Sequence, residues 1–156
     1  MPSRHSGSPR EVLALDAFVK LARAATTVTG RLNQRLQQDH DLTESQLGVL
    51  EALFHLGPMP QSELCRKILR SGSNVTTVVD NLERAGLVRR AAQDDDRRVR
   101  VVQLTTEGRR VIERVFPLHA GRVTELMGTL TRDEQRELGR LCRKLGLATA
   151  AADPED

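Results

Sequence analysis

One stretch in the middle of the chain constrains the fold more than any other. Residues 61–68 predict a short helix, residues 69–72 a tight turn, and residues 73–84 a second helix. Two Val-rich segments, 87–92 and 99–104, follow and predict a β-hairpin with a polar, charged connection. The chain must therefore place two short helices and a hairpin next to one another.

The second of these helices has two chemically different faces. Val75, Val79 and Leu82 recur at helical spacing and predict a buried stripe. The other face carries the short polar side chains of Ser73, Asn74, Thr77 and Asn81. This order of elements is the winged helix-turn-helix plan, in which the second helix enters the major groove of DNA while the first braces it. The alternative is an ordinary amphipathic helix with a solvated polar face.

The polar residues of this stretch have the hydrogen-bonding groups that DNA contacts require. Ser and Thr donate or accept, and Asn can pair with adenine through two hydrogen bonds. The helix start, with Ser71 and Ser73, offers free N–H groups to a phosphate. At the hairpin tip, Asp96 is expected to orient Arg98 toward a minor groove, where negative potential favours a guanidinium. The predicted DNA-binding residues are Ser71, Ser73, Asn74, Thr77, Asn81, Arg84, Asp96, Arg97 and Arg98.

Positive charge is concentrated in the same part of the chain. The formal net charge is only +3, yet residues 66–110 contain eleven Lys or Arg against six Asp or Glu. A basic middle between less basic flanks favours contact with a polyanion. A solvated, mixed-charge surface is the alternative interpretation.

The flanking segments predict long helices. Capping boxes start helices after Ser8, Thr43 and Thr131, and Thr105 is expected to cap a further helix. The predicted helices cover residues 9–38, 44–56, 106–130 and 132–147, with Pro117 kinking or interrupting the third of these. The first has one apolar stripe and is too long to bury itself in a small globule, so a partner helix is implied.

The run from Ser71 to Val88 resembles the recognition helix of the multiple-antibiotic-resistance regulator (MarR) family, and Asp96-Arg97-Arg98 through Gly108 resembles that family's wing. The resemblance implies a mainly α fold of about six helices with a small β-hairpin wing. It implies a single domain over residues 1–156, in which residues 43–105 are the DNA-binding module. Residues 9–38 and 106–147 are then the helical dimerisation region.

By the same resemblance, the protein is expected to be a homodimeric repressor of a palindromic double-stranded DNA operator. A small effector, phenolic or aromatic in many relatives, is expected where the dimer arm meets the DNA-reading module. The ligand-binding residues expected there are Phe18, Val49, Leu53 and His55. Redox- or zinc-responsive regulation by the same fold, or a winged-helix module that binds protein, are the alternatives.

Other classes of function find little support. No catalytic arrangement, phosphate loop or metal set is present, so we expect no enzyme activity, cofactor or metal. Cys65 and Cys142 are expected to be buried core residues without a redox role, and His40 with His119 makes only an incomplete zinc cluster. Without a membrane span or signal peptide in the sequence, we expect a cytoplasmic protein.

Overall fold

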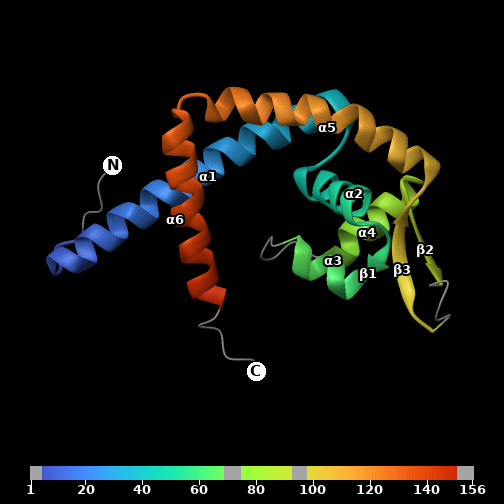
Figure 1. Cartoon of the computed structure of the whole chain (residues 1–156), viewed down its shortest axis with the longest axis horizontal. Coiled ribbons are helices and arrows are strands. Elements are labelled where there is room, and N and C mark those ends of the chain that lie inside the picture. Colours follow the sequence, from blue (N-terminus) through green and yellow to red (C-terminus); the bar gives the residue numbers. More distant parts are fainter. Residues whose placement is uncertain (1–4, 69–74, 93–97, 151–156) are drawn as a thin grey trace. The chain divides into compact units, whose positions relative to one another are not determined.

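The computed structural model describes residues 5–68, 75–92 and 98–150 (Figure 1). The helices in these residues are α1 (Pro9–His40), α2 (Glu44–Leu56), α3 (Gln61–Lys67), α4 (Val75–Arg84), α5 (Thr106–Met127) and α6 (Arg132–Ala150). The strands are β1 (Met59–Pro60), β2 (Val88–Ala92) and β3 (Arg100–Leu104). The predicted fold class, mainly helical with a small hairpin, is confirmed.

The chain divides after His119 into two compact units. In the first unit the hydrophobic core joins α2, α3, α4 and the sheet. Leu50, Leu64 and Leu82, one from each of these helices, are fully buried together with Val102 of β3. In the second unit the described side chains of α6 are all exposed. Across residues 5–68, 75–92 and 98–150, no helix is long and apolar enough to cross a membrane.

Three helices begin with the capping boxes that the sequence predicts. Ser8, Thr43 and Thr131 each accept a hydrogen bond through the side chain from the backbone N–H three residues later. The Glu or Gln at that later position accepts the backbone N–H of the cap residue in return. Helix α1 ends at His40, two residues later than predicted, where Asp41 adopts the left-handed conformation with φ 53°.

The sheet contains a strand that the sequence pattern did not predict. β2 and β3 form the expected antiparallel hairpin, each strand one residue shorter than predicted. β1 adds a third, edge strand, pairing Met59 with Val102 and Pro60 with Val101. Two residues are too few to show a strand period, and proline is tolerated at a sheet edge because it need not donate to the ladder.

Helix α5 continues through Pro117, so the predicted interruption is wrong, and the kink at Pro117 stays a prediction. Pro117 lies exposed, where a carbonyl that has lost its helical donor can bond to water instead. The helix ends at Met127, three residues earlier than predicted, and α6 runs three residues longer, to Ala150.

Close backbone contacts and hydrogen bonds join the hairpin to α5. The Thr105 hydroxyl caps α5 by accepting the Gly108 N–H at 3.0 Å, and it donates to the Gly86 carbonyl at 2.6 Å, just beyond the end of α4. The Thr105 N–H donates to the Leu87 carbonyl at 3.1 Å. A Cβ on Gly108 would lie 1.9 Å from that same Leu87 oxygen, which no real contact allows. Glycine at 108 therefore lets α5 start directly against the end of α4.

Replacing this glycine tests the junction. We expect Gly108→Ala to lower the free energy of unfolding by about 1–3 kcal/mol or more, because the methyl group collides with backbone and cannot rotate away. Gly121→Ala in the same helix is the matched control, since its Cβ would meet no described atom within 4 Å. It should be neutral or stabilising by up to about 1 kcal/mol. Equal stability of the two variants in urea titrations would contradict the proposed contact.

Candidate nucleic-acid interface

Helix α4 has the two faces that its sequence predicts. Val75, Val79 and Leu82 are buried in the core of the first unit. Thr76, Thr77, Asn81 and Arg84 are exposed. Because the apolar stripe anchors the helix, the polar stripe is held on the surface, where short hydrogen-bonding side chains can reach the edges of bases.

The predicted DNA-binding residues fall partly outside the described structure. Ser71, Ser73, Asn74, Asp96 and Arg97 lie outside the described residues.

The remaining four predicted DNA-binding residues are exposed: Thr77, Asn81 and Arg84 on α4, and Arg98 just before β3. The Arg84 guanidinium donates to the Asn81 side-chain oxygen at 3.1 Å, so these two side chains already share one surface. Their role in DNA contact stays a prediction.

The hairpin adds cations beside this helix. Arg89 and Arg100 are exposed on β2 and β3, and Arg98 is exposed where β3 begins. Arg90, by contrast, turns to the protein: its guanidinium donates to Asp80 at 2.6 Å and is also hydrogen-bonded to Glu83. The cluster of Arg90, Asp80 and Glu83 was not predicted from the sequence, because its members come from separate elements and only the folded chain brings them together.

Gln61 extends the cluster to α3. Its side-chain oxygen accepts from Arg90 at 3.1 Å, and its amide donates to the Thr76 hydroxyl at 2.8 Å. The start of α3, the exposed side of α4 and strand β2 are thus linked by side-chain hydrogen bonds. The Asp80 carboxylate, together with Glu83, raises the pKa of the Arg90 guanidinium above its ordinary value.

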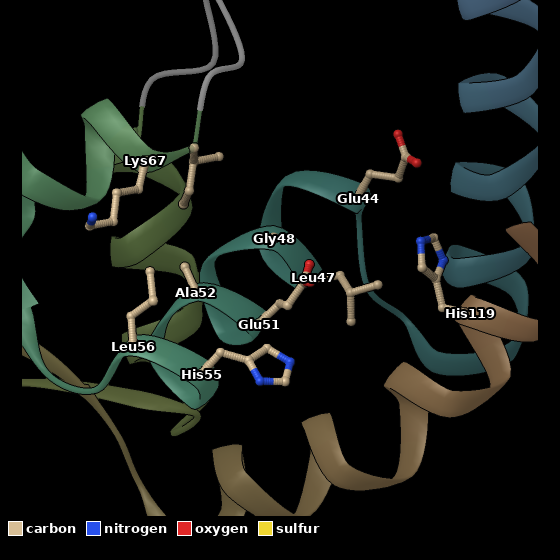
Figure 2. Close-up of a pocket in the computed structure, with 10 residues that line it drawn as sticks. Glu44, Leu47, Gly48, Glu51, Ala52, His55, Leu56, Lys67 and His119 are labelled. Atoms are coloured by element: carbon tan, nitrogen blue, oxygen red, sulfur yellow. The ribbon is translucent and has the colours of Figure 1, made fainter. Parts of the chain in front are cut away.

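A pocket of about 460 Å³ lies in the same unit, along one side of α2 (Figure 2). Most of its wall is α2, and Lys67 with Ile68 at the end of α3 and His119 of α5 complete it. The apolar part of the lining is Leu47, Ala52, Leu56 and Ile68, and the charged or polar part is Glu44, Glu51, His55, Lys67 and His119. The pocket therefore offers both a surface for an apolar ring and groups that can bind a carboxylate.

Of the four predicted ligand-binding residues, only His55 lines this pocket. Its ring lies edge-on between Phe54 and Phe116, with centroid separations of 5.1 and 5.6 Å. Val49 and Leu53 are buried in the core behind α2, with 1% and 2% of their surface exposed. The ligand set as a whole stays a prediction.

Phe18, the fourth predicted ligand-binding residue, is 65% exposed on α1 and does not line the pocket.

Both cysteines are exposed, so the prediction that they are buried is wrong. Leu64 faces the core, and Cys65 is the next residue, about 100° further round α3 and away from it. Cys142 lies on α6, whose described side chains are all exposed. Among the described residues, no three His, Cys, Asp or Glu side chains gather as a metal site.

Helix α4 buries one face, is braced by the shorter helix α3 and is followed by the basic β2–β3 hairpin. This arrangement defines a winged helix-turn-helix protein. The chain matches the MarR family over residues 42–99. It is 32% identical to the HTH-type transcriptional regulator MhqR of Bacillus subtilis, over 86% of this chain and 92% of MhqR. The chain belongs to the MarR family and is a transcriptional regulator that binds DNA.

Solved structures agree with this assignment. Sco3205, a MarR family transcriptional regulator from Streptomyces coelicolor solved in complex with DNA, is 25% identical with a TM-score of 0.77, over 99% of this chain and 95% of Sco3205. BpsR of Bordetella bronchiseptica, described for regulation of its DNA binding by 6-hydroxynicotinic acid, is 25% identical with a TM-score of 0.73, over 83% of this chain and 98% of BpsR.

Proposed function

We propose that the protein is a homodimeric repressor that binds a palindromic operator and is released by a small aromatic acid. The observation that carries the proposal is the exposed polar face of α4, held outward by the buried Val75, Val79 and Leu82. A helix of this kind beside a basic hairpin fits a major groove and an adjacent minor groove together.

In this proposal the two DNA-contacting parts have different tasks. Ser73, Asn74, Thr77 and Asn81 read base edges, and Ser71 and Arg84 hold the phosphate backbone. Arg98 enters the minor groove, supported by Asp96 and Arg97. Contacts to base edges carry sequence information, whereas minor-groove and phosphate contacts add affinity with little base discrimination.

Alanine variants separate these two tasks. Thr77→Ala and Asn81→Ala should each cost about 1–3 kcal/mol on a duplex selected by the protein from a random pool, and much less on a scrambled duplex. Arg98→Ala should weaken binding to both duplexes and reduce the slope of log affinity against log salt by about 1. Fluorescence anisotropy at two salt concentrations measures these effects.

The control is Thr27→Ala, an exposed threonine on α1. It should bind both duplexes as the unaltered protein does. Equal losses on selected and scrambled DNA for Asn81→Ala would show that α4 holds backbone and does not read sequence.

Two apolar surfaces support dimerisation. On α6, Leu138, Leu141 and Leu145 recur at helical spacing and are 37%, 48% and 54% exposed. On α1, Leu13 and Phe18 are 71% and 65% exposed. Exposed apolar side chains of this kind are unfavourable in water, and a second copy of the chain, carrying the same two surfaces, would cover them.

Charge placed in the α6 row tests dimerisation. Leu141→Glu should weaken the dimer by at least about 100-fold, because an unpaired carboxylate would be buried in the interface. Leu147→Glu, the same substitution on the opposite side of α6, is the matched control and should stay dimeric. Sedimentation at micromolar concentration gives the masses. A monomeric unaltered protein would rule the dimer out.

The pocket on α2 is the proposed effector site. Lys67, His55 and His119 supply donors for a carboxylate, and Leu47 with Leu56 supplies apolar contact for a ring. Val49 and Leu53 act through the core that shapes α2, and Phe18 is proposed to act from α1. The regulation described for BpsR by an aromatic acid supports this choice of ligand class.

Lys67→Met tests the effector site while preserving chain length. We expect the 6-hydroxynicotinic acid concentration that releases half of the DNA to rise at least 10-fold, since a hydrogen bond to a charged group contributes about 1.5–3 kcal/mol. Lys20→Met, at an exposed position on α1, removes the same charge and should leave release unchanged. If Lys67→Met and Lys20→Met give the same release curve, the effector binds outside the pocket on α2.

A further inference from the structure

The face of α4 that surrounds the reading residues carries two carboxylates. Asp80 and Glu83 lie three residues apart, on neighbouring turns of the helix, and their side chains are 47% and 41% exposed. Like charges at this spacing repel one another, and carboxylates on a helix that approaches DNA also repel phosphates. If α4 enters a groove of DNA, the negative charges of Asp80 and Glu83 must be neutralised.

Arg90 meets both carboxylates from the neighbouring strand. Its Nη2 lies 2.6 Å from the Asp80 Oδ1, and its Nη1 is hydrogen-bonded to the Glu83 Oε2. The backbone N–H of Arg90 donates to the other Glu83 oxygen at 3.2 Å. One residue of β2 thus holds two side chains of α4 by three hydrogen bonds, and the side chain of Arg90 is only 24% exposed.

The Arg90 guanidinium also donates a hydrogen bond to α3. Its Nη2 donates to the Gln61 Oε1 at 3.1 Å, and Gln61 in turn donates to the Thr76 hydroxyl on the exposed side of α4. Arginine suits this place because its planar fork can bridge several acceptors at once, which a lysine ammonium cannot do in the same geometry. The donors of Arg90 therefore point to protein acceptors.

The preceding residue of β2, Arg89, shows no hydrogen bond or ion pair with a carboxylate of α4 within the described residues. Arg89 is exposed, and its pairing partner across the hairpin is Gln103, a neutral residue. The two arginines carry equal charge one residue apart, but only Arg90 is bound to the carboxylates of α4 among the interactions seen in the described residues. Arg89 is therefore a matched control for Arg90.

We propose that Arg90 is a positioning residue for DNA binding: it neutralises Asp80 and Glu83 and fixes α4 to the hairpin, and it does not itself contact DNA. This inference rests on the proposed function only in that α4 is the helix that enters the groove. It predicts that the loss of DNA affinity on replacing Arg90 depends on the presence of the Asp80 and Glu83 carboxylates.

The test is a mutant cycle measured on the unaltered full chain and its variants. Binding to the selected duplex is measured for Arg90→Gln in the natural background and in an Asp80→Asn, Glu83→Gln background. We expect a loss of at least about 10-fold in the first and less than about 2-fold in the second, because the interaction being removed exists only in the first. Arg89→Gln should cost the same in both backgrounds.

An equal loss for Arg90→Gln in both backgrounds would overturn the proposal, because it would mean that Arg90 acts on the DNA directly. Thermal unfolding of every variant shows whether it is folded at the temperature of the binding assay. Should Arg90→Gln be unfolded, Arg90→Lys replaces it in the cycle. Lysine keeps the positive charge but lacks the planar fork of the guanidinium. We therefore expect Arg90→Lys to lower affinity for the selected duplex by at least about 3-fold in the natural background, and this loss should vanish in the Asp80→Asn, Glu83→Gln background.

Failure of the proposed reading surface gives a different pattern. Thr77→Ala and Asn81→Ala leave the Arg90 hydrogen bonds in place. If these two variants bind the selected duplex normally while the cycle shows the expected dependence, the positioning role stands and the assignment of reading residues is wrong.

Discussion

The burial of one side of α4 is the interaction on which the rest of the structure depends. Val79 and Leu82 are fully buried and Val75 nearly so, in a core shared with α2, α3 and the sheet. Burial of three such side chains contributes several kcal/mol, on the order of 1.5–3 kcal/mol each. Because this face cannot leave the core, the opposite polar face cannot turn inward, and the chain presents it as a fixed surface.

Polar contacts then set the surroundings of that surface. Arg90 ties α4 to β2, and Thr105 bridges the end of α4 to the start of α5. The proposed effector pocket includes Lys67 and Ile68, the last residues of α3 and its cap. Only residues 69–74 separate them from α4 along the chain, so a ligand bound there would lie within a few residues of the proposed reading helix.

The sequence predicted most of the helices because their ends are encoded locally. Ser8, Thr43 and Thr131 each form a cap with a residue three positions later, and such pairs are visible in the sequence alone. The stripe of Val75, Val79 and Leu82 likewise predicted which side of α4 is buried.

Features that depend on distant segments were missed. β1 exists because Met59 meets Val102 in the folded chain, and Arg90 finds its carboxylates across two elements. The burial of the cysteines was predicted from apolar neighbours, but a two-turn helix such as α3 buries only Leu64 and leaves Cys65 outside. The pocket on α2 combines α2, α3 and α5, so sequence analysis found only His55 among its residues.

We propose that two copies of α4 read one duplex. Hydroxyl-radical footprinting of the protein on a duplex selected from a random pool tests it most directly. We predict two protected half-sites in an inverted repeat, with centres about one helical turn, roughly 34–36 Å, apart on one side of the DNA. A single protected half-site, or protection without an inverted repeat, would contradict the claim.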